Sequence, residues 1–139
     1  MAGRVVVFAY PRTGKPEADE DYEEWDAIPG ARGCTPQNCA IRDDHARFAA
    51  LGVTVFGLSA QTPEDQAEAA ERLHLPYKLL SDARGELAEA LDLPRFDWHG
   101  TPLLKRITLF VQDGRVADVI YPVFPPDAAA AEALERLGG

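Results

Sequence analysis

The sequence predicts an α/β fold in which helices flank a mixed central sheet. Three apolar, β-branched segments alternate with helical segments along the first part of the chain, and strands joined by helices in this way run parallel. Two further strand segments lie on either side of Asp113 and Gly114, a dipeptide typical of a tight hairpin turn, so they are expected to add an antiparallel edge. A length of 139 residues suits one compact domain over residues 1–139.

The first strand is expected at residues 4–9, where an uninterrupted apolar run indicates a buried central strand that ends before Pro11. Residues 12–33 then form a long acidic insert, and a loop of this length in a small domain is usually functional or mobile. The first helix is expected to begin at Thr35 and Pro36, because Thr caps helices and Pro suits their first position.

The remaining elements follow from apolar periodicity, capping residues and turn signals. In chain order they are the end of the first helix at Gly52, a strand at 53–58, a helix from Thr62 to about Leu73, a short strand at 77–80, a helix from Ser81 to about Leu91, a loop over 94–104, strands at 106–111 and 116–121, and a helix from Pro125 to Gly138. This order of strands and helices is typical of a thioredoxin-like fold.

Composition narrows the classes of partner. The net charge is −9, from 23 acidic and 14 basic side chains, and such a surface repels phosphate backbones and anionic lipid. Nucleic acid and membrane are therefore poor partners. No apolar run reaches the roughly 18 residues of a membrane span, and the apolar stretch at 5–8 is too short for a signal peptide. A cytoplasmic location is the expectation.

Cys34 is the residue on which the functional prediction rests. It lies directly before Thr35 and Pro36, at the N-terminal turn of a predicted helix, where unpaired N–H groups and the helix dipole favour thiolate over thiol. Such a position can lower the pKa of a cysteine from roughly 8.5 to below neutrality. Arg32 is two residues away, and Arg106 heads a strand whose start can reach the same edge of the sheet. This context predicts a redox-active cysteine.

The spacing of Cys34 and Cys39 limits how the two sulfurs can react. On a helix they would point about 140° apart with a rise of about 7.5 Å, whereas a disulfide needs α-carbons about 5.5–6 Å apart. A bond between them therefore requires the first turns of the helix to unwind. A CxxC pair needs no such change, so a thioredoxin-like dithiol oxidoreductase is not expected. Together with His45 the cysteines give a zinc ion at most three ligands in no familiar spacing, so neither metal nor cofactor is expected.

At these residues the sequence resembles the peroxiredoxins, most closely the bacterioferritin comigratory protein or Q-type subfamily. The matching segments are Tyr10-Pro11, Gly33-Cys34-Thr35, Gln37, Cys39, Arg42-Asp43, Gly57-Leu58-Ser59, Leu79-Leu80-Ser81-Asp82 and Arg106-Ile107-Thr108. The similarity covers most of the chain, and the Cys-x4-Cys helix followed by Arg-Asp is fairly specific.

The resemblance implies a thiol peroxidase that reduces hydrogen peroxide and organic hydroperoxides. By this likeness Cys34 is the peroxidatic cysteine, Cys39 is the resolving cysteine, and Arg106 orients the thiolate and the peroxide. The implied substrate-binding residues are Pro11, Thr13, Gly33 and Thr35. The implied cycle passes through a sulfenic acid and an intramolecular disulfide, which thioredoxin or a similar dithiol reduces. A monomer or a weak homodimer is expected.

The chain departs from the subfamily pattern in three places. The subfamily normally has a proline seven residues, and a Thr or Ser three residues, before the peroxidatic cysteine. Here Pro11 lies 23 residues before Cys34, so about 16 residues are inserted, and Ala31 stands at the hydroxyl position. Either Thr13 supplies this hydroxyl or it is absent. The N-terminal hairpin of the family is expected to be missing, because the fold is trimmed or because the sequence starts late.

Alternatives to the peroxidase remain open. The first is a non-catalytic, redox-responsive binding protein on the same fold, with the acidic insert as a docking surface and Ala31 as the sign of lost turnover. The second is a structural domain in which Cys34 is inert. Phe96 and Trp98, in the loop before Arg106, either wall the peroxide site or close the core, and His99 beside Trp98 is a candidate for the lining of the pocket.

Overall fold

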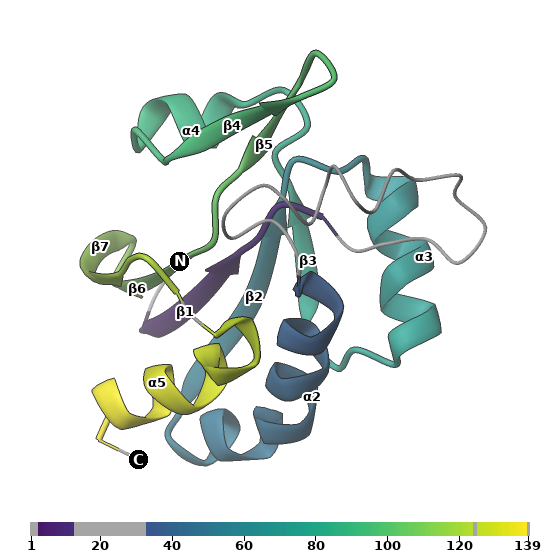
Figure 1. The fold of residues 1–139 in the computed structure, drawn as a ribbon. Coiled ribbons are helices and arrows are strands. Elements are labelled where there is room, and N and C mark those ends of the chain that lie inside the picture. Colours follow the sequence, from purple (N-terminus) through teal and green to yellow (C-terminus); the bar gives the residue numbers. More distant parts are fainter. Residues whose placement is uncertain (1–2, 13–32, 124, 139) are drawn as a thin grey trace.

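The computed structural model describes residues 3–12, 33–123 and 125–138 of the chain. In these residues a five-stranded mixed sheet has the strand order β3-β2-β1-β6-β7 (Figure 1). Its strands are β1 (Arg4–Ala9), β2 (Val53–Ser59), β3 (Lys78–Ser81), β6 (Ile107–Gln112) and β7 (Arg115–Ile120). Strands β1, β2 and β3 are parallel, whereas β6 and β7 pair antiparallel, so the predicted thioredoxin-like arrangement is confirmed.

Helices flank this sheet, and β1 contributes to the core on both of its faces. The helices are α2 (Cys34–Ala50), α3 (Pro63–Leu73), α4 (Glu86–Ala90) and α5 (Ala129–Arg136), the last preceded by a 3₁₀ turn, η1 (Pro126–Ala128). Alternate residues of a strand point to opposite faces. Val6 and Phe8 therefore pack in one cluster with α2 and α5, and Val5 and Val7 pack in another that includes α4. This double burial explains the uninterrupted apolar run of β1.

The start of α2 differs from the prediction and makes Cys34 the first residue of the helix. The helix begins at Cys34, one residue before the expected Thr35, so Thr35 lies inside the first turn and is not the cap. Gly33 is the N-cap, with a left-handed φ of 99° and no side-chain cap. A Cβ at Gly33 would lie 2.6 Å from Cγ of Pro126 in η1. Only glycine can adopt the left-handed φ and also leave room for the ring of Pro126 without strain.

Replacing Gly33 with alanine is expected to lower the free energy of unfolding by about 2–3 kcal/mol, because a left-handed alanine and a clash with a rigid proline ring add up. Urea denaturation measures the loss. Gly52→Ala, just beyond the other end of α2, is the matched control: it has a φ of 71° but no atom within 4 Å of the new Cβ. Gly52→Ala should lower the free energy of unfolding by about 1 kcal/mol. Equal losses in the two variants would show that the contact with Pro126 contributes nothing.

The segment 94–104 forms a hairpin, so its prediction as a loop is wrong. Strands β4 (Arg95–Trp98) and β5 (Thr101–Leu104) pair antiparallel in a separate small sheet. Two left-handed residues join them, His99 with a φ of 48° and Gly100 with a φ of 84°. These are the conformations that a two-residue hairpin turn requires, but His-Gly is a weaker signal than Asn-Gly or Asp-Gly.

Helix α4 is shorter than the predicted helix from Ser81. Ser81 ends β3, and Gly85, with a φ of 72°, is the N-cap. The carboxylate of Asp82 accepts hydrogen bonds from the backbone N–H groups of Leu87 and Ala88, both at 2.9 Å. Asp82 therefore stabilises the start of a helix that begins four residues after it.

Candidate active site

Cys34 lies at the point where α2 starts beside the carboxyl end of β1. As the first residue of the helix it is 4% exposed, and it is a free thiol, as is the half-buried Cys39. The helix continues without interruption through Cys39, so the spacing argument applies to the observed geometry. The two sulfurs cannot bond while this part of α2 is intact.

Arg106 contacts the sulfur directly. It is 3% exposed and lies one residue before β6, the neighbour of β1 in the sheet. Its Nη2 donates to Sγ of Cys34 at 2.9 Å, and its Nε donates to Oε1 of Gln37 at 2.8 Å. Gln37, three residues after Cys34 and fully buried, therefore holds the guanidinium toward the sulfur. The sequence showed Gln37 as part of a motif but not this function.

A second arginine approaches the sulfur from the end of β1. Pro11 is buried, and the backbone N–H of Arg12, the next residue, donates to Cys34. The guanidinium of Arg12 lies 5.4 Å from the ring centroid of Trp98, which stacks on His99 with centroids 4.2 Å apart. The β4–β5 hairpin thus places an aromatic wall beside the residues that contact the sulfur. Trp98 also packs on Leu103, so it closes the local core as well.

Burial raises the pKa of the Cys34 thiol above its ordinary value. The positive charge of Arg106, the N–H of Arg12 and the hydrogen bond from Arg106 act in the opposite direction but do not outweigh it. The expectation of a pKa below neutrality is therefore wrong for this closed arrangement. The helix-terminus argument assumed solvent access, and the sulfur has almost none. Arg106 is the strongest of the groups that favour the thiolate here.

The predicted site residues are only partly brought together. Cys34, Arg106, Pro11, Gly33 and Thr35 gather around the start of α2, whereas Cys39 lies farther along the helix. Thr13 and Ala31 lie outside the described residues, as does nearly all of the predicted acidic insert.

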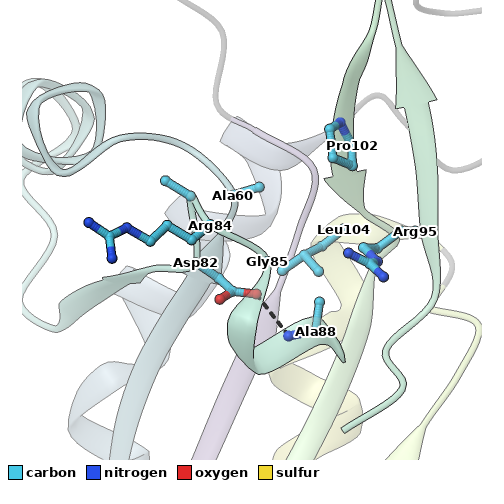
Figure 2. A pocket seen from close by; sticks show the side chains of 9 residues that line it. Ala60, Asp82, Arg84, Gly85, Ala88, Arg95, Pro102 and Leu104 are labelled. Atoms are coloured by element: carbon cyan, nitrogen blue, oxygen red, sulfur yellow. Dashed lines mark hydrogen bonds between the residues drawn. The ribbon is translucent and has the colours of Figure 1, made fainter. Parts of the chain in front are cut away.

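A cleft of about 60 Å³ lies elsewhere, between α4 and the β4–β5 hairpin (Figure 2). It is lined by Asp82, Gly85, Arg95 and Leu104, among others, and does not include Cys34. The described residues contain no cluster of three or more His, Cys, Asp or Glu side chains placed to hold a metal ion. In the same part of the chain, no helix has the length and apolar character needed to cross a bilayer.

Comparison with known proteins shows the family of this chain. Residues 1–135 match the model of the Redoxin family. The chain is 33% identical over 136 residues to a peroxiredoxin of Mycobacterium tuberculosis, an alignment that covers 97% of this chain and 78% of the relative. The chain belongs to the peroxiredoxins. This peroxiredoxin is also 31% identical over 133 residues to peroxiredoxin Q of Gentiana triflora, with 96% of the chain but only 54% of that relative covered.

Solved structures place this peroxiredoxin in the predicted subfamily. The crystal structure of peroxidoxin BcpB from M. tuberculosis is similar with a TM-score of 0.74 and 32% identity, over 99% of this chain and 79% of that one. Peroxiredoxin Q of Xanthomonas campestris has a TM-score of 0.73 at 20% identity, which shows the shared fold. The predicted resemblance to Q-type and bacterioferritin comigratory proteins is confirmed. The chain spans about half the length of the plant relatives.

Proposed function

We propose that this peroxiredoxin is a thiol peroxidase that reduces hydrogen peroxide and organic hydroperoxides through Cys34. The contact of 2.9 Å between Nη2 of Arg106 and Sγ of Cys34 carries the proposal. A guanidinium at this distance stabilises negative charge on the sulfur and can also donate to the peroxide oxygens as their bond breaks. Pro11, Gly33 and Thr35 are the described residues of the proposed substrate-binding set.

The reaction proceeds in two steps within this chain. The Cys34 thiolate attacks one peroxide oxygen, the O–O bond breaks, and the sulfur becomes a sulfenic acid. The other oxygen leaves as hydroxide or alkoxide and takes a proton from solvent. The Cys39 thiol then attacks the sulfenic sulfur, water leaves, and the intramolecular disulfide forms. Two electrons thus pass from the two thiols to the peroxide, and thioredoxin or a similar dithiol restores both thiols by exchange.

The second step, formation of the disulfide, requires α2 to change its conformation. Both cysteines lie on one continuous helix, so α2 must unwind between them before their sulfurs can meet. The closed arrangement therefore serves the attack on peroxide, and an opened arrangement serves the formation of the disulfide. A monomer or weak homodimer in the cytoplasm stays a prediction made from the sequence.

Mass spectrometry after one equivalent of hydrogen peroxide tests the assignment of the two cysteines. The expected product is a disulfide between Cys34 and Cys39, and in Cys39→Ser a sulfenic acid on Cys34 that a dimedone probe captures. A stable sulfenic acid in the unmodified protein would contradict the resolving function of Cys39. An assay coupled to thioredoxin and its reductase then tests the reductant.

A redox-responsive binding protein is the second candidate, and Ala31 in place of the subfamily's hydroxyl residue favours it. Burial of Cys34 also raises the pKa of its thiol, so less thiolate is available for sustained turnover at neutral pH. Oxidation of Cys34 without sustained peroxide consumption in the coupled assay would support this candidate over the enzyme.

A further inference from the structure

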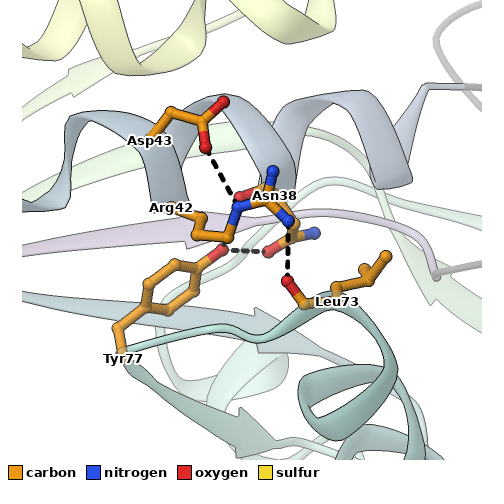
Figure 3. Close-up of polar contacts among 5 residues, drawn as sticks. All are labelled: Asn38, Arg42, Asp43, Leu73 and Tyr77. Atoms are coloured by element: carbon orange, nitrogen blue, oxygen red, sulfur yellow. Dashed lines mark hydrogen bonds and ion pairs between the residues drawn. The ribbon is translucent and has the colours of Figure 1, made fainter.

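A buried tyrosine is hydrogen-bonded to the part of α2 that separates the two cysteines. Tyr77 lies directly before β3 and is buried. Its hydroxyl lies 2.6 Å from Oδ1 and 3.1 Å from the backbone oxygen of Asn38, the residue before Cys39 (Figure 3). Asn38 is itself fully buried, and its Nδ2 donates to the backbone oxygen of Cys34 at 2.9 Å. Tyr77, Asn38 and Cys34 therefore form one hydrogen-bonded chain.

This chain of contacts crosses the turn that must open. Cys34 and Asn38 are four residues apart, so their bond closes the same helical turn that separates the cysteines. Unwinding that turn moves Asn38, so the hydrogen bond from the hydroxyl of Tyr77 must break when the turn opens and therefore opposes the opening. The hydroxyl is a permanent donor, because burial raises the pKa of Tyr77 and keeps it protonated.

A second contact holds the next part of the helix. Nη1 of Arg42 donates to the backbone oxygen of Leu73 at 2.8 Å, where α3 ends, and Nε of Arg42 pairs with Asp43 at 3.0 Å (Figure 3). Arg42 lies beyond Cys39, so this contact can survive when the segment between the cysteines unwinds. The two contacts thus differ. The hydrogen bond between Tyr77 and Asn38 must break before the disulfide can form, whereas the hydrogen bond between Arg42 and Leu73 can stay in place.

We propose that Tyr77 is a positioning residue that sets how long oxidised Cys34 stays in the closed site. This inference rests on the proposed peroxidase function. While the site is closed, the sulfenic acid of Cys34 can be attacked only by a second peroxide. That reaction transfers another oxygen to the sulfur, gives a sulfinic acid and releases water or an alcohol. Once Tyr77 releases Asn38, Cys39 can reach the sulfur and the disulfide forms instead. The hydroxyl of Tyr77 therefore influences how much of the sulfenic acid becomes the disulfide, which a dithiol can reduce, and how much becomes the irreversible sulfinic acid.

Tyr77→Phe tests the proposal because it removes the hydroxyl and keeps the ring. Opening of the segment is expected to become roughly two- to tenfold more favourable, the factor that one buried hydrogen bond is worth. After one equivalent of hydrogen peroxide, rapid quenching and mass spectrometry should show disulfide formation faster by that factor. The peroxide concentration that converts half of Cys34 to sulfinic acid should rise by the same factor. The rate of the first oxidation of Cys34 should stay as in the unmodified protein.

Tyr121→Phe is the matched control. Tyr121 is 48% exposed and follows β7, at the other edge of the sheet from β3, so it should change neither the disulfide rate nor the sulfinic midpoint. Hydrogen exchange of the reduced protein gives a readout that does not depend on catalysis. Amides of the segment 34–42 should exchange faster in Tyr77→Phe than in Tyr121→Phe.

The outcomes separate this inference from the proposed function. An unmodified protein that fails to oxidise Cys34 would overturn the peroxidase and, with it, the partition assigned to Tyr77. Normal oxidation with an unchanged disulfide rate in Tyr77→Phe would overturn only the inference. Unchanged hydrogen exchange over 34–42 would overturn it as well, because the segment would then not be held by this hydroxyl.

Discussion

Replacing Arg106 with methionine is expected to slow the oxidation of Cys34 by hydrogen peroxide about a hundred- to a thousandfold, the usual cost of removing one charge-stabilising donor. The side chain donates to the sulfur at 2.9 Å and is held there by Gln37. Methionine is shorter than arginine, but its unbranched apolar side chain replaces the aliphatic stem and suits a buried position. The loss should therefore fall on the chemistry more than on the fold.

The same variant should shift the pH dependence of the reactivity of Cys34 toward higher pH. Burial raises the pKa of the thiol, and Arg106 is the strongest influence that lowers it, so its removal raises the pKa further. Less thiolate then exists at neutral pH, and the rate of alkylation by iodoacetamide should rise only at higher pH than in the unmodified protein. Stopped-flow kinetics measure both quantities. Arg115→Met, on exposed β7, is the control, and a result identical to this control would show that Arg106 does not activate the sulfur.

Replacing Phe48 with alanine is expected to lower the free energy of unfolding by about 3–5 kcal/mol, the largest effect on stability in this set. Phe48 is fully buried on α2, and its ring meets that of Phe8 edge to face with centroids 5.9 Å apart. Alanine leaves a cavity between the helix and β1. Urea denaturation measures the loss, and Phe96→Ala, at a half-buried position in the β4–β5 hairpin, should cost clearly less.

The position of Phe48 makes a second outcome informative. It lies 14 residues after Cys34, or about 21 Å along the helix. Under conditions where the variant stays folded, the oxidation rate of Cys34 should remain near that of the unmodified protein. A large loss of rate would mean that the two ends of α2 do not act independently.

The parts of the fold that were predicted correctly depend on local signals. Asp113 and Gly114 adopt φ angles of 50° and 83°, as the hairpin prediction requires. Thr62 accepts a hydrogen bond from the N–H of Asp65 at 3.2 Å and caps α3, as expected from Thr followed by Pro. In both cases the residues that decide the structure are neighbours in the sequence.

The parts that were missed depend on contacts between distant residues. Gln37 and Arg106 are 69 positions apart, and Tyr77 and Asn38 are 39 apart, so no spacing rule links them. The direction of the pKa shift of Cys34 was missed for the same reason. The dipole at the start of α2 is visible in the sequence, but the burial that outweighs it results from tertiary packing.

The contacts at the two ends of the acidic insert explain how an active site can accept a long insertion. Arg12 contacts Cys34 from one end, and Gly33 packs on Pro126 at the other. Among the described residues, the sulfur is thus contacted from one end of the connection, and the glycine before it is packed at the other. In terms of loop-closure entropy, lengthening this connection from the usual seven residues to 23 costs only about 1 kcal/mol. The longer connection between Pro11 and Cys34 therefore costs little free energy of folding.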